Sequence, residues 1–183
     1  SASSQNIDSS SASSQAEEDL LPQEFPMEFE FSSGAGGWMT VMTVERDGSF
    51  TGVYHDSDMG DVGKDYPNGT EYLNRFSGRF GGFEQRDEHS MTMVLEELKQ
   101  EEPDKEWIED GIRYITQEAY GLDGGKNFVL YLPDTPVEGL DEEFLSWWPG
   151  RFEQPVPDTL NQWGIENVEM EEVFFSVEDC GLS

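Results

Sequence analysis

Apolar and polar residues alternate along much of the chain from residue 27 onward. Met27, Phe29 and Phe31 share one face of an extended segment, while acidic and serine side chains occupy the other. An alternation with a period of two is typical of a β-strand with one buried face. The same reasoning predicts further strand segments at 38–45, 49–54, 72–80, 90–98, 128–132 and 168–177, and apolar segments within 107–115 on either side of a turn at 110–111.

Turn-forming residues separate these segments. Asp47-Gly48 lies between two β-branched segments and is the strongest hairpin signal in the chain, because a tight hairpin turn needs residues that tolerate positive φ. A Gly-rich run at 34–37 predicts a turn or bulge. Residues 55–70 are polar and Gly-rich and predict a long, ordered loop.

One segment has helical spacing instead. Leu140, Phe144, Leu145 and Trp148 form a stripe that predicts a helix over 140–148, with Asp141 as its cap and a Pro-Gly pair at its end. Eight or nine short strands with this one short helix in the C-terminal half predict a mainly β protein. Its architecture is expected to be an antiparallel β-barrel or a sandwich.

The start of the chain differs in composition from the rest. Residues 1–15 include eight serines, which is typical of a solvated linker. We expect a disordered Ser-rich acidic tether at 1–24 and a single β-barrel-like domain at 25–183. The leader resembles the tether that follows the lipidated cysteine of bacterial lipoproteins, which implies an extracytoplasmic, cell-surface location after removal of a signal segment. The alternative is a disordered N-terminus of a cytosolic protein.

Charge narrows the range of partners. The chain has 10 basic and 40 acidic residues and a formal net charge of −30. This charge repels nucleic-acid phosphates and anionic lipid, so we expect no nucleic-acid partner and membrane association only through a removed lipid anchor. Cys180 is the single cysteine, which excludes an intramolecular disulfide and a cysteine-based metal cluster.

Gly36-Gly37-Trp38 resembles the Gly-x-Trp signature of the lipocalin and wider calycin families. The resemblance implies a calycin/lipocalin-like β-barrel in which Trp38 plugs the closed end. Together with the leader, it is similar to small bacterial lipoproteins that display a calycin-like domain outside the membrane. The alternative for Trp38 is an ordinary core tryptophan that follows a Gly-rich turn.

The stretch 55–61 carries the most suggestive metal chemistry. Asp56, Asp58 and Asp61 lie close together in a loop, and carboxylate oxygens of this kind are the ligands of calcium. The spacing does not match an EF-hand, because Gly60 and Pro67 occupy positions that need oxygen ligands. We therefore expect either a calcium site of another kind or aspartates that form Asx-turns, and no other cofactor.

The remaining candidates are aromatic. Trp38, Trp107 and Trp147 are the predicted ligand-binding residues, because exposed tryptophans stack on ligands and partners. The sequence contains no catalytic motif, and no catalytic residue is predicted. We expect a monomeric, non-catalytic, surface-tethered binding module whose ligand is a small molecule, a glycan or a protein. The alternatives are a secreted enzyme that uses loop carboxylates, with or without calcium, and a protein-interaction or inhibitory domain.

Overall fold

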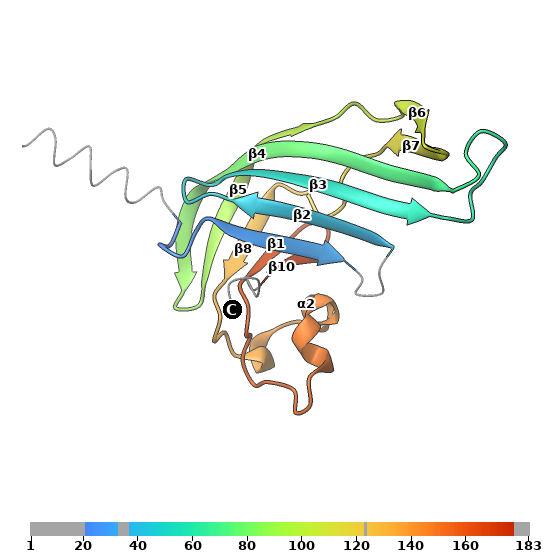
Figure 1. The fold of residues 1–183 in the computed structure, drawn as a ribbon. Helices are drawn as coiled ribbons and strands as arrows, with labels where there is room; N and C mark the ends of the chain where they lie inside the picture. The colour runs from blue at the N-terminus through green and yellow to red at the C-terminus, as the bar shows by residue number, and fades with distance from the viewer. Residues whose placement is uncertain (1–20, 33–36, 123, 178–183) are drawn as a thin grey trace, which may run out of the picture.

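A computed structural model describes residues 21–32, 37–122 and 124–177 (Figure 1). Strands account for about half of these residues. They are β1 (Met27–Ser32), β2 (Trp38–Val44), β3 (Ser49–Asp58), β4 (Thr70–Asp87), β5 (Ser90–Gln100), β6 (Glu106–Glu109), β7 (Ile112–Thr116), β8 (Asn127–Tyr131), β9 (Gly164–Asn167) and β10 (Glu172–Ser176). The helices are the 3₁₀ turns η1 (Val137–Gly139) and η2 (Pro149–Phe152) and the α-helix α2 (Glu142–Trp147). None of the described helices has the length and apolar composition needed to cross a bilayer.

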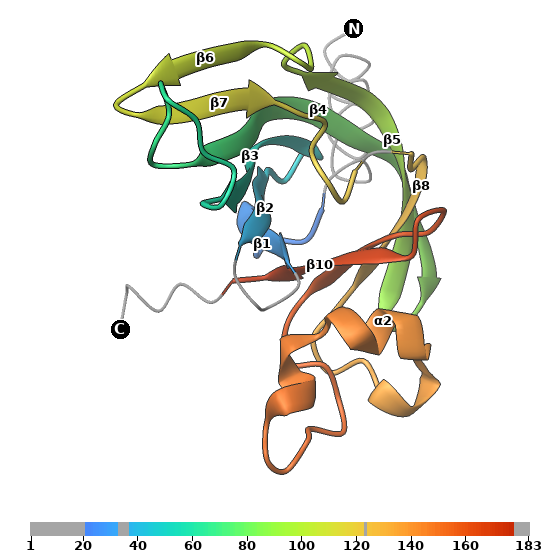
Figure 2. The same ribbon diagram turned by 90° about the vertical axis from the view of Figure 1, so that its right-hand side faces the viewer.

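Eight strands form a closed antiparallel barrel. Each of β1, β2, β3, β4, β5, β8, β9 and β10 pairs with the next in this order, and β10 returns to pair with β1. Figure 2 shows the resulting ring of strands. The prediction of an antiparallel barrel is therefore confirmed. The β6–β7 hairpin comes between β5 and β8 in the sequence but lies outside the ring, where β7 pairs in parallel with the start of β4.

The strands differ in detail from the predicted segments. β3 continues to Asp58, so the connection expected at 55–70 is confined to residues 59–69. The single closing strand predicted at 168–177 is instead the second arm of a hairpin, in which β9 and β10 pair through a turn at 168–171. Residues 34–36 of the predicted Gly-rich turn and most of the predicted tether, 1–20, lie outside the described residues.

Side chains fill the interior of the barrel. Alternate residues of each barrel strand point inward, and the rings of Phe50, Phe80 and Phe128 form a contiguous stack with centroids 4.9 and 5.0 Å apart. An eight-stranded barrel has an interior just wide enough for side chains. Most of the inward residues are fully buried, so the interior is a packed core.

Both ends of the barrel are also closed. At one end Leu21 exchanges hydrogen bonds with Arg46 in the β2–β3 turn, and Leu21 is almost fully buried. Leu21 thus packs as part of the main core. At the other end, Asn74 and Asn167 donate side-chain hydrogen bonds to the carbonyls of Gln117 and Gly121, which hold the 117–122 segment over the core.

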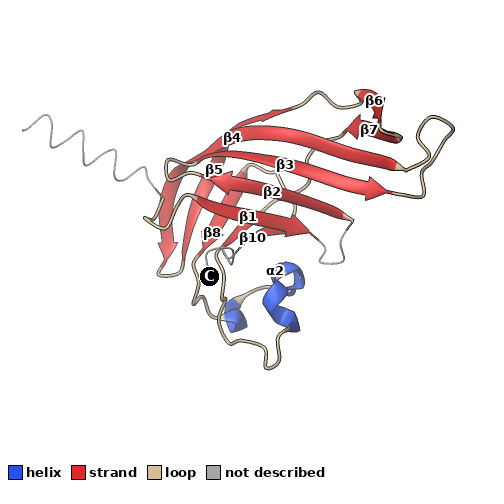
Figure 3. Cartoon of the chain, viewed as in Figure 1, coloured by secondary structure: helices blue, strands red, loops and turns tan. Residues whose placement is uncertain are grey.

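The helical segment packs on the outside of the barrel (Figure 3). The α-helix spans six residues, Glu142–Trp147, which is shorter than the predicted 140–148. Asp141 occupies the N-cap position without a side-chain cap hydrogen bond. The predicted apolar stripe of this segment joins Val129, Tyr131, Val173 and Phe175 from the outer faces of β8 and β10 in a second, smaller core.

Glycines in β3 and β4 make room for the interior rings. A Cβ atom at Gly52 would meet the Phe76 ring and the carbonyl oxygen of Val41. We expect Gly52→Ala to lower the free energy of unfolding by about 1–3 kcal/mol, because overpacking displaces neighbours in a filled core. Gly139→Ala is the matched control, since a Cβ atom there meets nothing within 4 Å. Urea unfolding of both variants checks the difference, and equal stabilities would contradict a packed interior.

Candidate functional site

A groove lies between the helical segment and the outer face of the barrel. We call it the α2 groove; its volume is about 690 Å³. It is lined by Glu30 and Ser32 from β1, by Val173, Phe175, Ser176 and Val177 at β10, and by Trp147, Pro149, Arg151, Phe152, Glu153, Asn161 and Gln162 from the α2–β9 region. A cavity of this size with aromatic walls and a few polar groups is typical of a small-molecule site.

The helical wall of the groove is held in place by Trp148. Its ring is almost fully buried, and its Nε1 donates a hydrogen bond to Oδ1 of Asn161 at 3.2 Å. Gly150 follows it in η2, where a Cβ atom would collide with the Trp148 ring. Because adjacent helical side chains point about 100° apart, the burial of Trp148 leaves Trp147 at the groove.

The opposite wall follows the seam between the first and last described strands. The pairing of β1 with β10 covers two residue pairs, Phe29 with Ser176 and Glu30 with Phe175. Beyond these pairs Trp147 packs its ring on Phe31, with centroids 4.6 Å apart. The indole Nε1 of Trp147 donates a hydrogen bond to the carbonyl of Glu171 at 3.0 Å. Trp147 thus joins the helical segment to the barrel at its seam.

Two of the three charged residues of the groove, Glu30 and Arg151, differ in their surroundings. Partial burial, reinforced by the nearby Glu28, raises the pKa of the Glu30 carboxyl. Among the described residues, no ion pair or hydrogen bond of the Glu30 carboxylate is found. Arg151 donates a hydrogen bond to the Trp148 carbonyl at 3.1 Å and lies 4.2 Å above the Phe152 ring.

The structure brings two of the three predicted ligand-binding tryptophans together. Trp38 and Trp147 meet edge to face with ring centroids 6.3 Å apart, and Trp38 also contacts Phe31 and Tyr120. Trp107 lies apart from them on β6, where it is 40% exposed and stacks on Tyr114. The aromatic cluster therefore lies where the barrel end meets the α2 groove, and Trp107 belongs to a different surface.

The predicted calcium ligands do not form a metal-binding group. Asp61 pairs with Arg113 at 2.6 Å, and Asp58 accepts a hydrogen bond from the backbone of Gly60 at 3.1 Å, which is an Asx-turn. Asp56 lies in β3 opposite Trp38. Across the described residues, no group of three or more His, Cys, Asp or Glu side chains could hold a metal ion. Cys180 lies outside the described residues.

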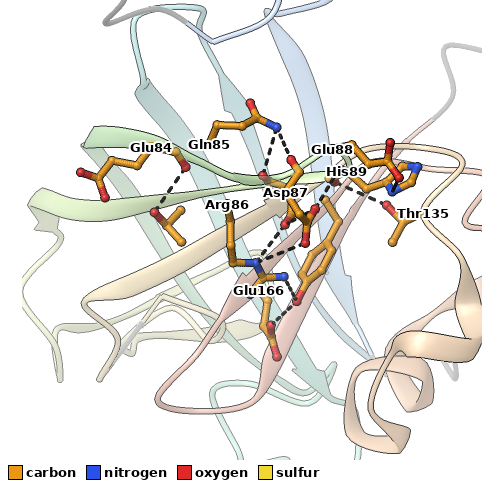
Figure 4. A network of polar contacts seen from close by, with 11 residues as sticks. Glu84, Gln85, Arg86, Asp87, Glu88, His89, Thr135 and Glu166 are labelled. Atoms are coloured by element: carbon orange, nitrogen blue, oxygen red, sulfur yellow. Dashed lines mark hydrogen bonds and ion pairs between the residues drawn. The ribbon is translucent and has the colours of Figure 1, made fainter.

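A second polar cluster lies at the β4–β5 turn (Figure 4). Arg86 donates hydrogen bonds to Ser90 Oγ at 2.9 Å and to the Tyr131 hydroxyl at 3.2 Å. Tyr131 in turn donates to Oε1 of Glu166 at 3.1 Å, and Asp87 accepts from Ser90 Oγ at 2.9 Å. Burial raises the pKa of the Glu166 carboxyl, with Asp141 and Glu171 adding to the effect. This cluster ties β4, β5, β8 and β9 together at one edge of the second core.

The fold and the groove define a small up-and-down β-barrel protein with a solid interior and a helical cover on one side. Comparisons of the chain with protein-family models, with curated proteins and with solved structures found no match. Geometry and chemistry are therefore the basis on which a function is assigned.

Several residues of the groove were missed by sequence reasoning. Glu30, Arg151 and Phe152 line it, but one acid among 40 carries no signal of its own. Phe152 follows the Pro-Gly pair that ends the predicted helix. An aromatic residue at such a helix end was the one signal in the sequence that could have indicated a groove residue. The pairing of β1 with β10, which brings Glu30 to the groove, has no local signature.

Because Glu166 is half-buried, we expect the stability difference between the parent and Glu166→Gln to depend on pH. Its folded-state pKa is raised above the ordinary value of 4.5 for a glutamate, so the folded state binds the proton more tightly than the unfolded state. The charged carboxylate therefore costs stability as pH rises through that pKa, and the cost is absent below the unfolded pKa. We expect Glu166→Gln to be more stable than the parent at pH 7, with the difference disappearing near pH ~4.

Urea unfolding from pH ~4 to ~7 measures this difference. Glu138→Gln removes an exposed acid from η1 and is the matched control. At pH ~7 the stability gain of Glu166→Gln should exceed any change that Glu138→Gln produces, because the Glu138 side chain is exposed. A Glu166→Gln difference that is flat with pH, or that grows toward low pH, would contradict the assignment.

Proposed function

We propose that this chain is an extracytoplasmic, surface-tethered and non-catalytic binding module that holds its ligand in the α2 groove. The observation that carries the proposal is the groove itself, a cavity of about 690 Å³ with aromatic walls beside a barrel whose interior is filled. Ligand sites in proteins are concave and largely apolar, with a few polar groups that fix orientation. The α2 groove has this composition, with Trp147, Phe152 and Phe175 as its aromatic residues.

The proposed binding site lies in a different place from the ligand site of a lipocalin. The up-and-down order of eight strands is compatible with a lipocalin-like barrel. In the lipocalin arrangement the ligand enters the barrel, whereas Phe50, Phe80 and Phe128 occupy that space here. We therefore assign the outer face of the barrel as the binding surface.

The leader and the charge support the proposed location. A Ser-rich segment ahead of a compact domain suits a tether that holds a domain away from a membrane surface. A net charge of −30 keeps such a domain soluble and repels it from anionic lipid. Both properties support display on a surface through a lipid anchor attached upstream of the residues described.

Phe152 offers the sharpest test of the binding site, because its side chain is 69% exposed and its removal leaves both cores intact. Saturation-transfer NMR of the full chain with a panel of neutral oligosaccharides, amino acids and alkylammonium salts identifies binders. We expect Phe152→Ala to weaken the binders about tenfold, the effect of about 1.4 kcal/mol.

Val156→Ala is the matched control, since Val156 is an exposed apolar residue of the same region, 46% exposed, that does not line the groove. It should leave binding unchanged. The proposed site is wrong if no member of the panel binds, or if both variants weaken binding equally.

A further inference from the structure

The hydrogen-bonding groups of the α2 groove are largely engaged within the protein. Asn161 Nδ2 donates to Oε2 of Glu153 at 2.7 Å, and Gln162 Nε2 donates to the Ser176 carbonyl at 2.8 Å. Oδ1 of Asn161 accepts from Trp148. A ligand such as a sugar, recognised through many hydrogen bonds, would have to displace these internal partners. The groove is better suited to a ligand that is recognised by charge and by aromatic faces.

Glu30 supplies the charge. Its carboxylate lines the groove, is partly buried, and pairs with no cation among the described residues. A partly buried carboxylate attracts a cation more strongly than an exposed one, because less water screens the interaction. The net charge of −30 adds a long-range field that draws cations toward the domain.

Aromatic rings supply the second element of recognition. Trp147, Phe152 and Phe175 all line the groove, and the electron-rich faces of such rings attract cations, especially alkylated ammonium groups. The Phe152 ring already accepts a guanidinium, since Arg151 lies 4.2 Å above it. The charge of Arg151 is thereby directed to the Phe152 ring and the Trp148 carbonyl, and no ion pair joins Arg151 to Glu30 among the described residues.

From these contacts we infer that the α2 groove binds a small organic cation with an alkylated ammonium group, which Glu30 pairs with and Trp147 and Phe152 contact through their rings. This inference rests on the proposed function, because it names the ligand class of the same groove. Ammonium binding by a carboxylate and aromatic faces needs no hydrogen bond from the engaged amides.

Choline is the probe, and 3,3-dimethyl-1-butanol, which has the same shape without the charge, is its matched control ligand. Isothermal titration of the full chain at low salt should give saturable choline binding and at least tenfold weaker binding of the neutral alcohol. Absence of saturation up to about 20 mM choline overturns the inference. Equal binding of the two compounds also overturns it, because the charge would then contribute nothing.

Two variants test whether the Glu30 carboxylate is the group that binds the choline ammonium. Glu30→Gln keeps the shape of the side chain and should weaken choline binding at least tenfold. Glu28→Gln removes one charge from the same face of β1, two residues away and outside the groove lining, so it should change binding less than about twofold. Equal losses in the two variants would assign the effect to net charge and overturn the site.

Two further ligands test whether Arg151 recognises the ligand and whether the ammonium group belongs to a lipid headgroup. Glycine betaine carries the same ammonium group with a carboxylate, and tighter binding of betaine than of choline would assign recognition to Arg151 and overturn the role of Glu30. Phosphatidylcholine vesicles that compete with choline would identify a lipid headgroup as the source of the ammonium, whereas no competition identifies a free cation.

The failures of the two proposals are distinguishable. If neutral oligosaccharides or uncharged members of the panel bind in a manner sensitive to Phe152→Ala while choline does not bind, the groove remains the binding site and the cation assignment fails. If neither class binds, both the groove and its ligand class are wrong.

Discussion

The filled interior of the barrel is the constraint on which the rest of the structure depends. Eight strands enclose a space about as wide as the side chains that point into it, and Phe50, Phe80 and Phe128 occupy it in contact with one another. Rings of this size fit because glycines leave room beside them, as at Gly78, where a Cβ atom would meet the Phe50 ring. Within the described residues the interior is therefore filled with side chains, and the α2 groove lies outside, where the helical segment builds a second core.

Much of the fold could be predicted from local patterns. Period-two alternation located the strands because it reports which face is buried, and Asp47-Gly48 located a hairpin because few residues tolerate its backbone geometry. β9 escaped prediction since its four residues, Gly164–Asn167, contain one aliphatic side chain and no visible alternation. The choice between barrel and sandwich also lay beyond local patterns, because closure depends on β1 meeting β10 across most of the chain.

The candidate site was partly predictable for a similar reason. The adjacent Trp147 and Trp148 had to point in different directions from one helix, so one of them was expected near the surface, and Trp147 lines the groove. The meeting of Trp147 with Trp38 depends on how the helical segment folds back on the barrel, which no spacing in the sequence encodes. The three aspartates at 56–61 have the right chemistry for calcium, but Arg113, which engages Asp61, comes from a distant hairpin.

The pairing of β1 with β10 also sets the order in which the molecule can be completed. These are the first and last strands of the described chain. In an antiparallel meander, each of the remaining strand pairs can form as soon as its two strands exist. The ring itself closes only after β10, the last described strand, is available to pair with β1. Glu30 and Phe175 lie on the two sides of this seam and both line the α2 groove, so a chain that lacks β10 would lack one wall of the groove. Occupancy of the groove would therefore report that the barrel has closed.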